Sequence, residues 1–313
     1  MKKLLTAAAL AATLMSSNAS AMSKTADTGY TETKYPIVLV HGFLGWDTMV
    51  GIDYWYKITE TLQDGGADVH VITVPNANTP EVRGEELINQ IESVLAITGA
   101  EKVNLIGHSH GGPTSRYAAS VRPDLVASVT SVSGVNKGTP IADTLMETAE
   151  DSAAFDAVFG GIINLAAEAL NIISGANYDD VNAMTAIASM TTERAVVFNA
   201  QHPGGIPETA CGEGDYEYNG IRYYSWAGAD PTTVAYDPMD LITVAFSQFF
   251  PEGYVNDGFV GACDAHLGMV IRDDFVMNHL DEINQFLGLH DLNETDPVAV
   301  YRTHANRLKN AGL

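Results

Sequence analysis

Short apolar runs rich in β-branched residues recur along the chain and alternate with stretches whose apolar residues follow a helical period. The runs show no polar alternation, which is typical of strands buried on both faces of a parallel sheet. The clearest helix carries Leu87, Ile91 and Leu95 on one face and ends at Gly99. The predicted strands are Pro36 to Val40, Val69 to Val74, Val103 to Ile106, Val126 to Val132 and Tyr223 to Ala227. This alternation predicts an α/β fold with a mostly parallel central sheet and helices on both faces.

The first 21 residues have the pattern of a cleaved secretory signal. Lys2 and Lys3 precede an apolar run, Leu4 to Met15, and a polar stretch then ends in Ala-Ser-Ala at positions 19 to 21. The run has 12 residues, whereas a helix that crosses a bilayer needs about 20. We therefore expect export rather than a membrane anchor. Residues 22 to 313 contain no internal repeat and no Pro/Gly/Ser-rich linker, and we expect them to form one domain.

Charge and cysteine content exclude several classes of protein. The formal net charge is −23, which argues against binding nucleic acid, because such affinity comes mainly from neutralising phosphates with Lys and Arg. Cys211 and Cys263 are the two cysteines, too few for a four-thiolate zinc site. An exported chain with one pair is expected to form a disulfide, and only one pairing is possible. The loop of 52 positions that it closes would stabilise the fold by roughly 4 kcal/mol in the chain-entropy model.

A nucleophile motif follows the predicted strand that ends at Ile106. The residues are Gly107-His108-Ser109-His110-Gly111, and a helix-compatible run comes next. A serine hydroxyl becomes a useful nucleophile when a strained turn between strand and helix presents it to a base. The flanking glycines allow strand and helix to approach closely. Ser109 is therefore the candidate nucleophile.

Acyl transfer also needs backbone N–H groups aimed at the developing oxyanion. One expected donor is the amide of His110, the residue after the candidate nucleophile. The other lies in the segment His41-Gly42-Phe43-Leu44-Gly45, directly after the first strong strand, where Phe43 can offer its N–H.

The residues alone leave the base and the acid open. In this arrangement the chain order is nucleophile, acid, base. The base candidates are His266, His279, His290 and His304, and the acid candidates are Asp230, Asp237, Asp257 and Asp264. His279 follows the strand-like stretch Met269 to Arg272 and precedes a helical pattern, so its position favours it. Asp257 lies in an Asn-Asp-Gly turn that can hold a carboxylate on a loop.

Together, these motifs resemble those of the secreted bacterial triacylglycerol lipases of the α/β-hydrolase fold. The chain is most similar to the calcium-dependent, foldase-assisted group of Pseudomonas and Vibrio. The most specific stretches are Tyr35 to Gly42, Val103 to Pro113, His266 to Asp273 and Tyr301 to Asn310. The resemblance implies that His279 is the base and Asp257 the acid. Position 43 is often Met in this family and is Phe here, which leaves the backbone donor intact.

The resemblance also implies one structural calcium ion. Its ligands would be the carboxylates of Asp237 and Asp281 and the backbone carbonyls of Gln285 and Leu289. The plainer interpretation of Asp281 is a carboxylate near the start of a helix, where acidic side chains are favoured. A bound ion would fix the loop that carries His279, so its role would be structural.

Residues 141 to 190 are rich in apolar residues but have little strand character. They predict helices laid over the edge of the sheet, and we expect these helices to form a lid over the active site rather than part of the core. We expect a secreted serine lipase that acts on long-chain triacylglycerols at an oil–water interface, assisted by a periplasmic foldase during maturation. The alternatives are a soluble carboxylesterase, a phospholipase, or a non-catalytic lipid-binding protein on a hydrolase scaffold.

Overall fold

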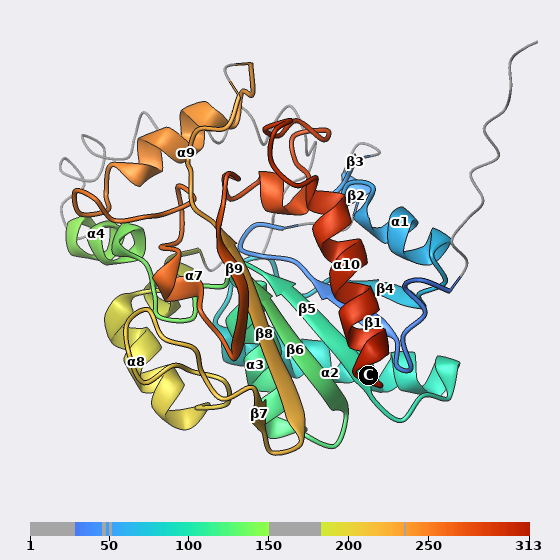
Figure 1. The fold of residues 1–313 in the computed structure, drawn as a ribbon. Helices are drawn as coiled ribbons and strands as arrows, with labels where there is room; N and C mark the ends of the chain where they lie inside the picture. Colours follow the sequence, from blue (N-terminus) through green and yellow to red (C-terminus); the bar gives the residue numbers. More distant parts are fainter. Residues whose placement is uncertain (1–28, 46–47, 50–51, 150–182, 235) are drawn as a thin grey trace, which may run out of the picture.

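A seven-stranded sheet forms the centre of the molecule in the computed structural model, which describes residues 29–45, 48–49, 52–149, 183–234 and 236–313 (Figure 1). The strands lie in the order β4-β1-β5-β6-β8-β7, and β9 also pairs with β8. Their bounds are β1 Ile37–Val40, β4 Val69–Ile72, β5 Val103–His108, β6 Val126–Val132, β7 Glu217–Tyr218, β8 Ile221–Gly228 and β9 Met269–Phe275. A separate antiparallel pair is formed by β2 (Thr48–Met49) and β3 (Ile52–Asp53).

All pairings in the large sheet are parallel except that of β7 with β8. The predicted strands are present, and the bounds of β6 are those expected from the sequence. Because parallel strands end at one edge of the sheet, the turns that follow β1, β5, β8 and β9 lie along a common edge. In open α/β sheets that edge is where ligands bind.

Helices cover both faces of the sheet, as the apolar pattern predicts (Figure 1). On one face α2 (Pro80–Thr98) packs on α3 (Gly111–Val121), and a core that includes Leu87 and Ile91 lies beneath them. On the other face α1 (Ile58–Asp64) packs on α10 (Pro297–Asn310), over a core that contains Trp55 and Trp226. The predicted end of α2 is confirmed, since Gly99 adopts a φ of 71° just after its last turn.

The predicted cap over residues 141 to 190 lies largely outside the described residues. Its described ends are helical: α4 (Pro140–Thr148) packs against α7 (Ala183–Ser189), and α8 (Thr192–Gln201) follows. A further helix, α9 (Asp240–Ser247), lies in the long connection between β8 and β9. Short 3-10 turns at η2 (Cys263–Ala265) and η3 (Asp281–Ile283) complete this region. The predicted signal segment, residues 1 to 21, also lies outside the described residues.

The structure contains the predicted disulfide between Cys211 and Cys263. The ammonium group of Lys137 donates hydrogen bonds to the carbonyl oxygens of Ala210 and Cys263, so it fastens the same two loops. The bridge spans 52 positions, and the chain between the two cysteines includes β8, α9 and Asp257. None of the helices in the described part of the chain is long and apolar enough to cross a membrane.

Candidate active site

Ser109 occupies a tight turn between β5 and α3. Its φ of 56° lies in the left-handed region, which costs a non-glycine residue free energy and is typical of functional turns. The turn closes because Gly107 and Gly111 lack side chains. A Cβ at Gly107 would lie 2.2 Å from the carbonyl oxygen of Gly111, and one at Gly111 equally close to that of Val40. Sequence and geometry therefore agree on a strained strand–turn–helix that presents the Ser109 side chain at the edge of the sheet.

His279 and Asp257, which the resemblance singled out, lie in direct contact. The Nδ1 atom of His279 is 2.7 Å from Oδ2 of Asp257, and both side chains are buried. The other carboxylate oxygen accepts hydrogen bonds from the amides of Phe259 and Val260. Since an ionised carboxylate can only accept, Nδ1 of His279 carries the proton. Its Nε2 atom is thereby left as a proton acceptor.

The backbone also fixes these two residues relative to each other. The amide of His279 donates to the carbonyl oxygen of Asp257 at 2.9 Å. The ring of Phe259 packs against the imidazole of His279, with ring centres 5.2 Å apart. The two loops therefore meet through a main-chain bond, a side-chain bond and a ring contact.

The other histidines and aspartates considered from sequence have different partners. His266 lies between the Gly212 carbonyl and the carboxylate of Asp273, beside the disulfide. His304 bonds Thr130 on the sheet, and His290 bonds the carbonyl of Gly288. Each of these three histidines is therefore hydrogen-bonded to groups other than the candidate acid Asp257. The aspartate alternatives have local partners too: Asp230 accepts the Thr232 amide, Asp237 the Met239 amide, and Asp264 the Tyr254 hydroxyl.

The predicted oxyanion donors lie at two neighbouring loop positions. A Cβ at Gly42 would approach the Cβ of Ser109 to 2.8 Å, so the loop that contains Phe43 packs directly on the nucleophile turn. Within the described residues, the amides of Phe43 and His110 donate to no protein acceptor. Unused N–H groups beside a serine hydroxyl are what an oxyanion hole requires.

A buried arginine for which the sequence carries no motif supports the loop that contains Phe43. Arg83, on α2, donates from Nη2 to the carbonyl oxygen of His41 at 2.6 Å. Its Nη1 donates to the carbonyl of Pro75, and its Nε to the hydroxyl of Thr114 on α3. The guanidinium therefore ties the loop to both helices on that face. Its helical position predicts burial, but no local pattern predicts these partners.

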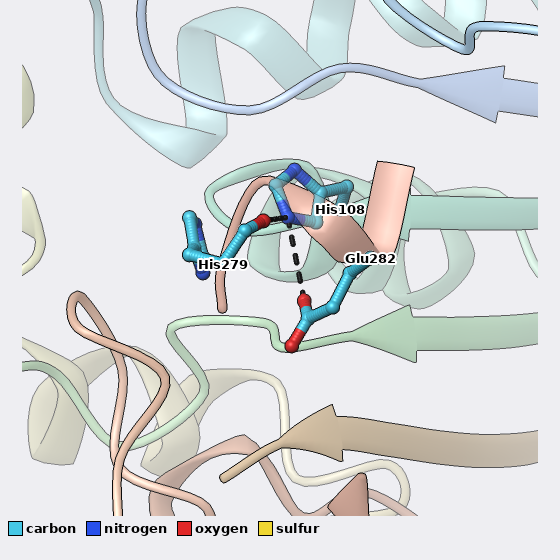
Figure 2. A group of neighbouring side chains, drawn as sticks. All are labelled: His108, His279 and Glu282. Carbon is cyan, nitrogen blue, oxygen red and sulfur yellow. Dashed lines mark hydrogen bonds and ion pairs between the residues drawn. The ribbon is translucent and has the colours of Figure 1, made fainter. Parts of the chain in front are cut away.

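Glu282 is a second buried acid next to His279, in the 3-10 turn η3, where no local sequence pattern predicts its contacts. Its Oε1 accepts hydrogen bonds from the Ser133 hydroxyl and the Gly228 amide. Its Oε2 lies 3.5 Å from Nε2 of His108 (Figure 2). Burial, and then the negative charge of Asp257, raise the pKa of the Glu282 carboxyl well above its ordinary value. His108, His279 and Glu282 bring one ligand atom each to within 4.8 Å of one another, a spacing that could hold a metal ion.

A different pair of carboxylates fits the predicted calcium ion. Asp237 and Asp281 are buried, and Oδ2 of the first and Oδ1 of the second have no hydrogen-bond partner. Burial raises the pKa of Asp237 to about 6 and that of Asp281 to about 8, and neighbouring acidic charge adds to both shifts. Within the described part of the chain, no amide donates to the carbonyl oxygens of Gln285 or Leu289. Four hard oxygen atoms are thus available to a cation.

Comparison with known proteins agrees with the fold. The family model described as alpha/beta hydrolase fold matches residues 35–280. A triacylglycerol lipase of Vibrio cholerae is 52% identical over 285 residues, which cover 91% of each chain. A triacylglycerol lipase of Pseudomonas fragi is 39% identical over 90% of this chain and 98% of its own. The chain therefore belongs to the α/β-hydrolase fold family. Within that family it belongs to the bacterial triacylglycerol lipases, and it is a lipase enzyme.

Solved structures show the same fold at low sequence identity. A Bacillus licheniformis lipase in its mature form superposes with a TM-score of 0.55 and 19% identity, over 80% of this chain and 87% of that one. A metagenomic carboxyl esterase gives a TM-score of 0.60 and 18% identity, over 89% and 76%. The predicted α/β-hydrolase fold is confirmed.

Proposed function

We propose that the chain is a secreted serine lipase that hydrolyses long-chain triacylglycerols through an acyl-enzyme intermediate. The observation that carries this proposal is the hydrogen bond between His279 and Asp257, formed at the edge of the sheet where the strained turn presents Ser109. A nucleophile on a tight turn, a base with a free Nε2 and an acid that fixes its tautomer form a working set for acyl transfer.

In the first half of the reaction, the hydroxyl oxygen of Ser109 attacks the ester carbonyl while Nε2 of His279 takes its proton. Asp257 stabilises the imidazolium that forms. The negative charge on the carbonyl oxygen is bound by the amides of Phe43 and His110. Collapse of this tetrahedral species breaks the bond to the alcohol oxygen, which leaves with the proton from His279. The fatty acyl group stays on Ser109 as an ester.

In the second half, water replaces the alcohol. His279 takes a proton from the water, whose oxygen attacks the acyl carbon and forms a second oxyanion in the same pair of amides. The bond to Ser109 then breaks, the serine oxygen recovers a proton from His279, and the fatty acid is released. The site returns to its starting protonation state, so the cycle consumes one ester and one water.

Two features support a triacylglycerol substrate over a small soluble ester. The relatives with the highest identities described above are named triacylglycerol lipases. In addition, α9 turns apolar side chains outward near the acid loop: Leu241 is 66% exposed and Val244 is 36% exposed. Such residues suit contact with an oil surface, where exposed apolar area is favourable rather than costly.

This substrate class predicts a clear order of activities. We expect the protein to release fatty acid from an emulsified long-chain triacylglycerol, with a rate per enzyme that exceeds its rate on a dissolved short-chain ester. Titration of released acid at constant pH measures both. Cleavage of the soluble ester with an untouched emulsion would favour a carboxylesterase, preferential cleavage of phosphatidylcholine vesicles a phospholipase, and cleavage of none a binding protein.

We further propose that Asp237, Asp281 and the carbonyl oxygens of Gln285 and Leu289 hold one calcium ion. Support comes from their unpartnered, buried oxygen atoms. A bound divalent cation would neutralise the mutual repulsion of the two carboxylates. Asp281 also accepts the amide of Asn278, so an ion held there would hold the segment from Asn278 to Asp281, which includes His279.

We also propose that the protein is exported through the periplasm and that a lipase foldase assists its folding there. The disulfide supports an oxidising compartment, and the pattern of residues 1 to 21 supports a secretory signal. The proposal of a foldase rests on the family resemblance alone. Its contribution can be measured as the yield of active enzyme recovered from denaturant with and without a periplasmic extract of a foldase-positive strain.

A further inference from the structure

His108 contacts the loop that carries His279 and, through Tyr54, the loop that contains Gly42 and Phe43. It has no part in the reaction described above. It is the last residue of β5, directly before Ser109, and its side chain is buried. Its ring packs against the ring of His279, with ring centres 4.5 Å apart and planes inclined at 41° (Figure 2). A titratable side chain in this position calls for a reason other than filling space.

Hydrogen bonding fixes the tautomer of His108. Its Nε2 lies 3.0 Å from the carbonyl oxygen of His279, and because a carbonyl can only accept, Nε2 carries the hydrogen. Burial, and then the neighbouring His279, lower the pKa of His108 well below its ordinary value, so the ring is neutral and Nδ1 has no hydrogen. That atom lies 2.7 Å from the hydroxyl oxygen of Tyr54, which must therefore donate to it.

The chain of bonds continues into the oxyanion loop. The hydroxyl oxygen of Tyr54 accepts the amide of Gly42 at 3.0 Å. Gly42 directly precedes Phe43, a proposed oxyanion donor. Three hydrogen bonds thus connect Gly42 to the backbone of His279 through Tyr54 and His108, and in each of them the residue nearer to Gly42 is the donor. They connect the loop that would bind the oxyanion to the loop that carries the base.

We propose that His108 is a positioning residue that holds the base loop in register with the oxyanion loop, and that Tyr54 is its partner in this task. The proposal rests on the proposed function of Ser109 and His279. A metal ion bound by His108, His279 and Glu282 is a weaker explanation for why these three side chains lie together. Nε2 of His108 already donates to a carbonyl, and Oε1 of Glu282 already accepts two hydrogen bonds.

The test compares His108→Phe, which keeps a ring and removes both bonds, with Tyr54→Phe, which removes one hydroxyl. Active sites are counted by stoichiometric reaction with a p-nitrophenyl alkylphosphonate, so that misfolded protein does not enter the rate. We expect kcat per titrated site on a dissolved ester to fall about 10- to 100-fold in His108→Phe, with KM within twofold, because small displacements of a catalytic group cost rates of this size. Tyr54→Phe should fall in the same direction by a smaller factor.

Two further readouts separate positioning from simple structural support. The double variant should lose no more than His108→Phe alone, since both residues act through one chain of bonds. The downfield proton NMR signal of the His279 Nδ1–H should move in His108→Phe and stay in place in His70→Phe, a control on the edge strand β4. His70 is partly exposed and pairs with Asp68.

An unchanged kcat per site in either single variant, or losses that multiply in the double variant, would overturn the positioning role. If His108→Phe does not fold, Tyr54→Phe decides the matter alone through its kcat and NMR signal. Failure of the proposed function looks different, because the parent protein itself would then react with no phosphonate. A labelled parent whose variants keep full kcat would leave the function standing and remove only this inference.

Discussion

Replacing Ser109 with alanine is expected to lower ester hydrolysis by about 10⁴-fold or more, because the acyl-enzyme route disappears with the hydroxyl. What remains would come from the amides of Phe43 and His110 and from binding alone. The substitution removes one oxygen atom at the edge of the sheet and leaves the hydrogen bond between His279 and Asp257 in place. We therefore expect an intact fold, shown by an unchanged circular dichroism spectrum and by a melting temperature no lower than that of the parent.

The matched control is Ser120→Ala, on the same helix that follows the nucleophile. Ser120 is exposed, so its loss should leave rate and stability unchanged. Rates are measured on a dissolved ester and on an emulsion. Mass spectrometry of the purified variant shows whether any parent protein is present. A folded Ser109→Ala protein that keeps more than a hundredth of the parent rate on either substrate would exclude Ser109 as the nucleophile.

Removal of calcium should produce the largest change in stability. At a free calcium concentration 1,000 times the dissociation constant, binding stabilises the folded state by about 4 kcal/mol. For a chain of this size that corresponds to a rise in melting temperature of roughly 7 °C. We expect calorimetry in excess chelator to show this loss and added calcium to restore it. Activity well below the new melting point should decline less than stability does, since the ion touches no reacting atom.

Asp281→Asn tests whether the calcium effect arises at the proposed site. This variant removes a ligand charge but also relieves repulsion between buried carboxylates, so its melting temperature in chelator should equal or exceed that of the parent. Its response to calcium should largely vanish. Asp64→Asn, an exposed site with the same change in charge, should respond as the parent does. Equal melting temperatures of the parent with calcium and with chelator would refute the site.

The sequence predicts the centre of the sheet well because strands β1, β5 and β6 are buried on both faces. Runs of small and β-branched residues such as Val126 to Val132 give a strong local signal, and β6 has those bounds in the structure. Gly99 marked a helix end through its freedom to adopt positive φ. The two-residue strands β2, β3 and β7 were not predicted, since two residues carry no periodicity. The helical pattern expected after His279 is a single 3-10 turn.

Some residues of the candidate site lie in a local sequence pattern that predicts their role, and others do not. Ser109 was evident because a turn of this kind needs glycines on both sides in the sequence itself. The family resemblance, rather than loop position, predicts the partnership of Asp257 with His279, because loop position alone is compatible with four histidines. Tyr54, Arg83 and Glu282 are recognised only in three dimensions. The period of α2 places Arg83 on the buried face of that helix, but it does not predict which distant polar atoms the guanidinium contacts.

The measurement that tests the central claim most directly is covalent labelling of the site. The parent protein is treated with a p-nitrophenyl alkylphosphonate, digested, and analysed by tandem mass spectrometry. A serine lipase of the proposed kind will gain one phosphonyl group per molecule, located on Ser109, as its ester hydrolysis falls to zero in proportion. Full inactivation with the group on another residue, or retained hydrolysis by protein fully labelled at Ser109, would contradict the assignment of Ser109 as the nucleophile.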